Sequence, residues 1–346
     1  MGGEPSTKST AWTEFDRIVA EAAPGGVHGN PWVRTSSGDL GYTPDHRTLR
    51  RLLAVPLRLR ASTTTGVPAL ALDVWLSYEL RRAGFDPDAV WPRATSPRVL
   101  PAPIVSLLDK VSSKERDALW RRLSSKTPPA GVAASNAIIL GKNYLKQVDV
   151  GMSGWATGPE LLISTKRMDS SFGKNAANRV EESYGDAKNL RLRHPLAALG
   201  FVYGLRSTIF DESPDTAEWL IDLLQKLGRE DDAYHAVALV VIDYDDTMAV
   251  DSGPDDPGDD DDPLADAGLR PDEVPSSGES DQMRLMGTES GEPLRVDLQT
   301  DRVPPALRTG AFLAEMVTRV LDATPVNFHR EARRRRREAP SVQDDV

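Results

Sequence analysis

Two apolar segments in the second half of the chain constrain its fold more than any other feature. HPLAALGFVYGLRSTIF (194–210) and HAVALVVIDYD (235–245) are apolar over the length of a strand, and TAEWLIDLLQKLG (216–228) between them has helical spacing. Apolar runs of this length, without polar alternation, are typical of strands covered on both faces. These segments therefore predict the interior of a sheet that helices cover.

The preceding segments extend the same pattern. IILGKNYLKQVDVGMSGW (138–155) and PELLISTKRM (159–168) are rich in apolar and β-branched residues, and the turn-forming SGWATGP between them predicts a hairpin. Residues 174–189 then have helical character. The order strand, strand, helix, strand, helix, strand over residues 130–246 predicts an α/β fold with a mixed sheet flanked by helices.

The segments outside this region differ in character. Helical spacing at 11–23, 68–84 and 101–125 predicts a helical N-terminal region, with loops over 24–66. We divide the chain into four parts. Residues 1–128 form a helical region that either recognises DNA or belongs to the core, and residues 129–250 form the core. Residues 251–292 are predicted to be a disordered acidic insertion, and residues 293–346 to form a C-terminal helix with a basic tail.

The charge of the chain is unevenly distributed. The formal net charge is −10, but residues 251–300 hold fifteen acids and three bases, so the remainder sums to about +2. The negative net charge of the whole chain therefore does not exclude a polyanionic partner. DSGPDDPGDDDDPLADAG is too polar to bury a core and predicts a solvated loop, or alternatively a DNA mimic. The run Arg333 to Arg337 predicts either phosphate contacts or a solvated helix end.

Several classes of protein are excluded by composition. The chain has no cysteine, which removes disulfides, thiolate nucleophiles and cysteine-bound metals. Its five histidines form neither an HExxH motif nor a close pair. No segment approaches the ~20 apolar residues of a membrane span, and the first residues lack the apolar part of a signal peptide. We expect a soluble, cytoplasmic protein.

The predicted hairpin brings an acid and a base together. Asp149 lies on its first strand, and Glu160, Ser164 and Lys166 share one face of its second strand because side chains alternate. A carboxylate that holds a divalent cation, beside a lysine that stabilises charge on a phosphate, suits metal-dependent phosphodiester hydrolysis. On a helical wheel, Glu181 lies at the edge of the apolar stripe of 174–189 and can supply a second carboxylate.

One arrangement resembles the motif of the PD-(D/E)xK nuclease superfamily: Asp149 is followed by a turn and then by Ser164-Thr165-Lys166 at the end of an apolar strand. Ser164 stands at the acid position, which resembles the restriction-endonuclease subgroup whose second acid has moved to the following helix. The resemblance implies Asp149, Lys166 and Glu181 as catalytic residues, with Asp149 and Glu181 as metal ligands. Glu160 and Ser164 are accessory candidates, and Glu79 is a third because members often carry a glutamate on an earlier helix.

The resemblance also implies a function. We expect a restriction-endonuclease-like fold and a Mg²⁺-dependent DNA endonuclease, with Mn²⁺ as a substitute, acting as a homodimer on double-stranded DNA in a restriction or phage-defence system. Basic and amide side chains after the motif would contact the substrate: Arg167, Lys174, Asn178 and Arg179. The alternative is a non-catalytic DNA-binding or regulatory protein that retains a nuclease fold, which Ser164 at the acid position favours. A scaffold that binds another protein through 1–128 is a further alternative.

Overall fold

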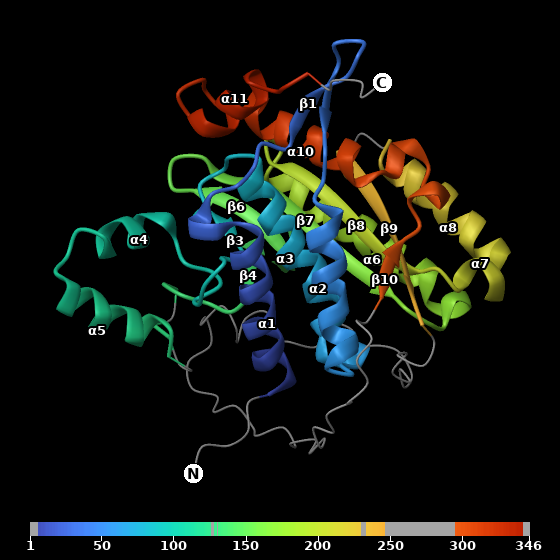
Figure 1. The fold of residues 1–346 in the computed structure, drawn as a ribbon, viewed down its shortest axis with the longest axis horizontal. Helices are drawn as coiled ribbons and strands as arrows, with labels where there is room; N and C mark the ends of the chain where they lie inside the picture. Colours follow the sequence, from blue (N-terminus) through green and yellow to red (C-terminus); the bar gives the residue numbers. More distant parts are fainter. Residues whose placement is uncertain (1–5, 126–127, 130, 230–232, 246–294, 342–346) are drawn as a thin grey trace.

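A six-stranded sheet forms the centre of the molecule, in the order β10–β9–β8–β7–β6–β3 (Figure 1). The structure is a computed structural model that describes residues 6–125, 128–129, 131–229, 233–245 and 295–341. The strands are β3 (Val90–Trp91), β6 (Val150–Gly154), β7 (Gly158–Met168), β8 (Ala198–Arg206), β9 (Ala236–Tyr244) and β10 (Val296–Leu298). The three central strands β7, β8 and β9 run parallel, whereas the outer pairs are antiparallel. The predicted α/β class and mixed sheet are confirmed.

The sheet separates two apolar cores because its central strands are buried on both faces. On β8, Val202 faces one core and Phe201 the other, and on β9 Val240 and Leu239 divide in the same way. The first core also contains α1 (Thr7–Ala22), α2 (His46–Arg58), α3 (Val67–Arg82) and α10 (Thr309–Ala323). The second contains α6 (Phe172–Arg193), α7 (Ile209–Glu212) and α8 (Pro214–Leu227). The apolar runs therefore form interior strands, as their sequences predict.

The N-terminal helices belong to the same core as the sheet. β3 is an edge strand of that sheet, and α3 packs on β6 and β7. The prediction of loops over 24–66 is wrong, because α2 lies within it. Asp45 caps α2 by accepting from the backbone N–H of Thr48 at 2.9 Å, and Leu49, Leu52 and Leu53 are fully buried on one side. Pro56 lies in the last turns of this helix.

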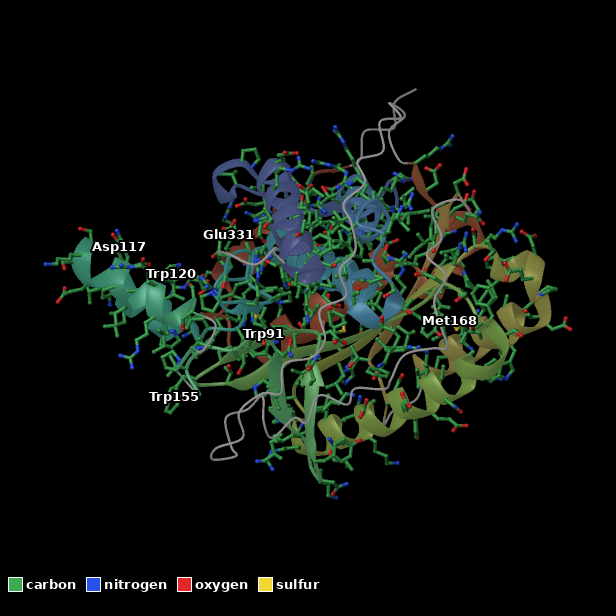
Figure 2. All side chains as sticks on the ribbon, turned by 90° about the horizontal axis from the view of Figure 1, so that it is seen from below. Trp91, Asp117, Trp120, Trp155, Met168 and Glu331 are labelled. Atoms are coloured by element: carbon green, nitrogen blue, oxygen red, sulfur yellow. The ribbon has the colours of Figure 1, made fainter. Side chains whose placement is uncertain are left out.

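Smaller elements surround the sheet. β1 (Trp32–Arg34) pairs with β2 (Leu40–Tyr42), and β4 (Ala137–Leu140) pairs with β5 (Leu145–Val148). The helices α4 (Ala102–Leu108) and α5 (Ser113–Leu123) form an arm beside the sheet with a small apolar cluster of its own. Figure 2 shows Asp117 and Trp120 of this arm far from the centre of the sheet. The helical segment predicted over 101–125, with a possible break near Ser112, is divided into two helices, and Ser112 caps the second, α5.

The arginines of α11 (Arg330–Arg337) hold this helix against the protein. Arg333 donates to the carbonyls of Thr324 at 2.7 Å and Phe328 at 3.0 Å, beyond the end of α10. Arg335 donates to the carbonyl of Arg82 at 2.7 Å, and Arg336 lies over the ring of Trp32. These contacts give much of the basic run a structural role. The predicted acidic insertion lies outside the described residues.

No helix among the described residues is long and apolar enough to cross a membrane.

Gly84 allows α11 to approach the end of α3. Its φ is +98°, and a Cβ atom there would lie 2.8 Å from the backbone nitrogen of Ala332. We expect Gly84→Ala to lower the free energy of unfolding by about 2–4 kcal/mol, because a left-handed backbone and an overpacked contact both cost energy. Urea unfolding followed by circular dichroism measures this loss.

Gly38 provides the matched control, since its φ is +86° but nothing lies within 4 Å of the corresponding Cβ position. Gly38→Ala should cost only the backbone strain, about 1–2 kcal/mol. Equal losses in the two variants would contradict the close contact between α3 and α11.

Candidate functional site

A cleft of about 530 Å³ lies where the sheet meets α3 and α6. Its wall includes Lys8 and Trp12 of α1, the first turns of α3, and the segment from Ala137 to Asp149 in part. β7 contributes Ser164 and the three residues that follow it. The cleft therefore collects side chains from segments that are far apart in the sequence, and both Asp149 and Lys166 line it.

Thr165 on β7 holds two carboxylates in this cleft. Its backbone N–H donates to Oδ2 of Asp149 at 2.7 Å, and its hydroxyl donates to Oδ1 of Asp73 at 2.6 Å. Asp149 lies between β5 and β6, whereas Asp73 lies on α3. One residue thus fixes an acid from a neighbouring strand and an acid from the helix above the sheet.

The two acids interact electrostatically. Asp73 is only 8% exposed, and burial together with the charge of Asp149 raises its pKa well above the usual value for a carboxyl group. The charges of Lys8 and Lys166 oppose that increase. Two carboxylates held together in a partly buried site, beside a lysine, form an arrangement that a cation would stabilise.

The other charged groups of the cleft are mainly basic. Six basic side chains among the described residues line it, against three carboxylates: Lys8, Arg98, Lys146, Lys166, Arg167 and Arg179, against Asp73, Asp149 and Asp186. Lys146 forms an ion pair with Asp186 at 2.8 Å. The excess of positive charge around the two adjacent acids suits a polyanion that approaches with a cation.

The side of α6 that faces the cleft differs from the predicted one. Its buried stripe runs through Ala176, Val180, Ser183 and Ala187, whereas Tyr184 is 37% exposed. This places Arg179, Ser183 and Asp186 on the cleft and leaves Glu181 exposed and outside it. The structure therefore does not bring Glu181 to Lys166. The sequence predicts a stripe with Tyr184 in place of Ser183, which puts Glu181 closer to the buried side.

Ser164 is buried at the bottom of the cleft. It is 8% exposed and hydrogen-bonds to Tyr234, whose hydroxyl donates to the carbonyl of Ser183 at 3.0 Å. Burial raises the pKa of Tyr234 above its ordinary value, so the phenol remains protonated. The acid position of the motif is therefore filled by a neutral hydrogen-bonded contact between the sheet and α6.

Glu79 and Glu160 lie away from the cleft. Glu79 is fully buried, pairs with Arg82 at 2.7 Å, and accepts from the backbone N–H of Asp45 at 2.7 Å. Glu160 lies at the opposite end of β7 from Lys166 and pairs with His329 at 2.7 Å. Asp73, and not Glu79, is the acid of α3 that lines the cleft.

The predicted substrate contacts are distributed unevenly. Arg179 and Arg167 line the cleft, but Arg167 is 6% exposed and paired with Asp169 at 2.9 Å. Asn178 is exposed and lies outside the cleft. The side chain of Lys174 lies outside the described residues.

Asp73 and Asp149 are the adjacent carboxylates of the cleft that could contact a bound cation. Among the described residues, no group of three or more histidine, aspartate or glutamate side chains is positioned to hold a metal. Mg²⁺ keeps several waters and is commonly bound by one or two carboxylates together with substrate phosphates. Asp73 and Asp149 are such a pair, and each already has one oxygen oriented by Thr165.

Sequence reasoning missed Asp73. The available signal was an acid inside PALALDVWLSYEL, a segment that is otherwise almost entirely apolar. A charged residue in such a helix needs a partner when it is buried. The partner, Thr165, is 92 positions away in the sequence.

Comparison with models of protein families, with curated proteins and with solved structures gave no match to this chain.

Asp73→Asn should stabilise the protein at neutral pH. The pKa of Asp73 in the folded protein lies above its ordinary value of 3.8. As the pH rises above 3.8, the unfolded state therefore loses this proton before the folded state does, and the free energy of unfolding falls. Asparagine removes the charge and can still accept from Thr165. We expect the free energy of unfolding at pH 7.5 to rise by about 0.5–2 kcal/mol.

Urea unfolding at pH 7.5 and pH 3.5 measures the effect, and the gain should disappear at the lower pH because both states then bind the proton. Glu181→Gln removes an exposed carboxylate from α6 and should change stability by less than about 0.5 kcal/mol. A loss of stability in Asp73→Asn at pH 7.5 would show that its charge is compensated within the protein.

Proposed function

We propose that this chain is a Mg²⁺-dependent DNA endonuclease, with Mn²⁺ as a substitute, that hydrolyses phosphodiester bonds in the cleft. The proposal is carried by one observation: Thr165 holds Asp73 and Asp149 together in a basic cleft that Lys166 also lines. Two carboxylates with an adjacent lysine are the groups that metal-dependent phosphodiester hydrolysis requires. The resemblance to the PD-(D/E)xK superfamily supports the same reaction, and with it a restriction-endonuclease-like fold.

Asp73 takes the place of Glu181 as the second acid in this proposal. The two acids of such a site must contact the same ion. Asp149 lines the cleft, but Glu181 is exposed and lies outside it. Asp73 shares Thr165 with Asp149, which keeps the two carboxylates together. The metal ligands are therefore Asp73 and Asp149, with a third contribution from the backbone near Thr165.

The protein groups perform distinct tasks in the reaction. When bound, Mg²⁺ supplies Lewis-acid activation of the scissile phosphate. Lys166 holds the attacking water or stabilises the negative charge that grows on the phosphate oxygens. Attack at phosphorus then releases the 3′ oxygen and leaves a 5′-phosphate. Thr165 contributes by keeping both acids fixed, since its donors prevent them from turning apart.

The basic lining of the cleft supports DNA as the substrate. Arg179 of α6 and Lys8 of α1 lie on the cleft and offer phosphate contacts from different elements. A single cleft cuts one strand, so cleavage of double-stranded DNA requires two copies, and we propose a homodimer. A restriction or phage-defence role follows from the family resemblance alone.

A non-catalytic DNA-binding protein is the second candidate. Two observations favour it: Ser164 occupies the acid position of the motif, and the described residues contain no group of three metal-binding side chains. In this case the cleft would bind DNA through its basic residues without hydrolysing it.

Cleavage of plasmid and phage DNA, methylated and unmethylated, tests the proposal directly. With Mg²⁺ or Mn²⁺, the wild-type protein should cut the DNA, and EDTA should abolish the activity. Asp73→Asn, Asp149→Asn and Lys166→Ala should each lower the rate by about a hundredfold or more, because each removes a group that stabilises the transition state.

Glu181→Gln is the matched control, and it should retain wild-type activity. Activity lost in Glu181→Gln but retained in Asp73→Asn would overturn the assignment of Asp73. DNA binding without any cleavage would support the non-catalytic candidate, and neither binding nor cleavage would reject both.

A further inference from the structure

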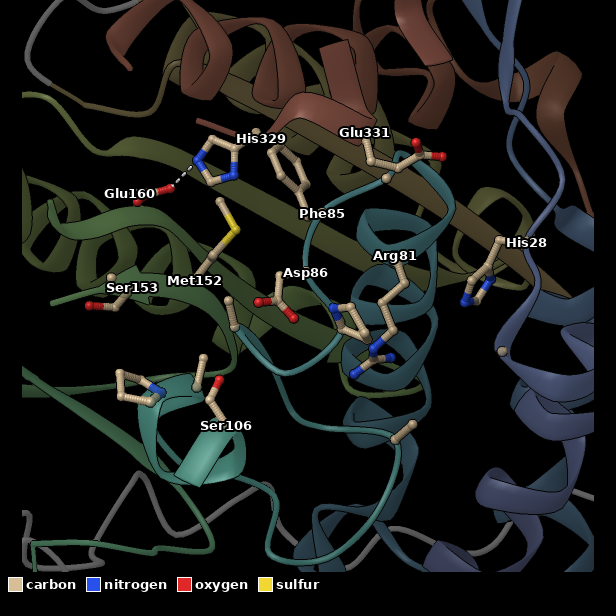
Figure 3. A pocket seen from close by; sticks show the side chains of 18 of the residues that line it. His28, Arg81, Phe85, Asp86, Ser106, Met152, Ser153, Glu160, His329 and Glu331 are labelled. Atoms are coloured by element: carbon tan, nitrogen blue, oxygen red, sulfur yellow. Dashed lines mark ion pairs between the residues drawn. The ribbon is translucent and has the colours of Figure 1, made fainter. Parts of the chain in front are cut away.

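A second and larger cavity lies at the other end of the β6–β7 hairpin. Its volume is about 1290 Å³, and its wall comes from α1, the end of α3, the arm that contains α4, the hairpin, and the segment before α11. Figure 3 shows Arg81 and His28 on one side, with Glu160 and His329 on another. The volume exceeds what most small ligands require, so the cavity can enclose a molecule with distinct parts.

Arg81 is a buried cation in the wall of this cavity. It is 4% exposed, and its guanidinium donates to the hydroxyl of Ser77 and the carbonyl of Pro92. No described carboxylate forms an ion pair with it, and its Nε has no hydrogen-bond partner. A buried charge without an opposite charge is costly, so an anion at this place would stabilise the protein.

The neighbouring arginines show that this lack of a partner is particular to Arg81. Arg93 and Arg98 are also buried, but Arg93 pairs with Asp88 at 2.6 Å and Arg98 pairs with Asp16 at 2.9 Å. Burial and the charges of these two arginines lower the pKa of Arg81 to about 10, so it remains a cation at neutral pH. The charges of Asp88 and Asp16 also act on Arg81, but both acids are paired with its neighbours, so this group of three arginines has two carboxylates.

His28 adds a neutral polar group near Arg81. Burial and the charge of Arg81 lower the pKa of His28 to about 4, so the ring is uncharged at neutral pH. Its Nδ1 is buried and lacks a hydrogen-bond partner among the described residues. Arg335 and Arg82 also act on His28, so the positive charges around its ring come from three arginines.

The rest of the wall combines apolar surface and aromatic rings with charged side chains of both signs: the carboxylates Asp16, Asp86, Glu160 and Glu331, and the cations Lys110, Arg330 and Arg335. Phe85 and Met152 are buried in it, and Trp155 at the tip of the hairpin is 96% exposed. Figure 2 shows Trp155 at the outer end of the hairpin. An exposed tryptophan beside a cavity with buried aromatic groups offers a surface for a flat ring.

We propose that this cavity binds a mononucleotide, with its phosphate at the Arg81 side and its base against the aromatic wall. A phosphate would give Arg81 an anionic partner, and a base would place a flat ring against the aromatic side chains. The site is separate from the cleft: Lys8 and Trp12 of α1 line the cleft, whereas Asp16 and Val19 further along the same helix line the cavity. The proposal does not depend on nuclease activity.

Isothermal titration calorimetry with AMP, GMP, CMP and TMP, in EDTA to keep the cleft free of divalent cations, tests this site. At least one nucleotide should bind saturably at a ratio of one per chain. Inorganic phosphate alone should bind at least tenfold more weakly, because it lacks the base. Arg81→Gln should weaken binding about 10- to 100-fold, the range for a hydrogen bond to a charged group.

Two tryptophan variants keep the test valid if Arg81→Gln fails to fold. Ser106 is exposed on α4 and lines the cavity, so Ser106→Trp should block binding. Ser113 on α5 is exposed but does not line it, so Ser113→Trp should bind as wild type does. Lys166→Ala should also bind normally.

Several outcomes would overturn the proposal. They are no saturable binding of any nucleotide, phosphate binding as tightly as the nucleotides, and equal binding by Ser106→Trp and wild type. Binding lost in Lys166→Ala would place the nucleotide in the cleft. None of these outcomes bears on DNA cleavage, which is measured separately.

Discussion

The site depends on the two hydrogen bonds that Thr165 donates. Asp73 and Asp149 repel each other, and burial makes their charges more costly, so they would separate if nothing held them. Thr165 prevents this because its backbone N–H and its hydroxyl point to opposite neighbours, a strand on one side and α3 on the other. The buried position of β7 between two cores makes Thr165 a rigid support for both acids.

The parts of the site that were predicted from sequence are those that lie within one hairpin. Ser164 and Lys166 follow from the alternation of side chains on β7. Asp149 was predicted on the first strand but lies just before β6, and the structure places all three on the cleft. Asp73 could not be found in this way, because its contact with Thr165 joins residues that are 92 positions apart. The error at Glu181 has a different cause: with Ser183 in place of Tyr184, the centre of the buried stripe of α6 moves by about 25° away from Glu181, which was already at its edge.

The fold was predictable to the extent that burial appears as a local pattern. The runs that became β8 and β9 have almost no polar residues, and a strand buried on both faces needs none. Helix α2 was missed because its four arginines and His46 mask the buried leucines. The basic run of α11 shows the opposite limit: its composition predicts either phosphate contacts or a solvated helix end, whereas Arg333 and Arg335 donate to carbonyls of the protein.

The cleft and the cavity lie at the two ends of one hairpin, and the buried groups that each contains have opposite charges. The cleft holds adjacent carboxylates that a cation would balance, and the cavity holds a guanidinium that an anion would balance. Burial of Asp73 beside Asp149 and burial of Arg81 beside Arg93 and Arg98 both lower the stability of the protein alone. Arg98 lies between them: it lines the cleft, stacks on Trp12 there, and pairs with Asp16 of the cavity wall. A shift of α1 would therefore alter both sites, which gives a ligand in either one a physical route to affect the other.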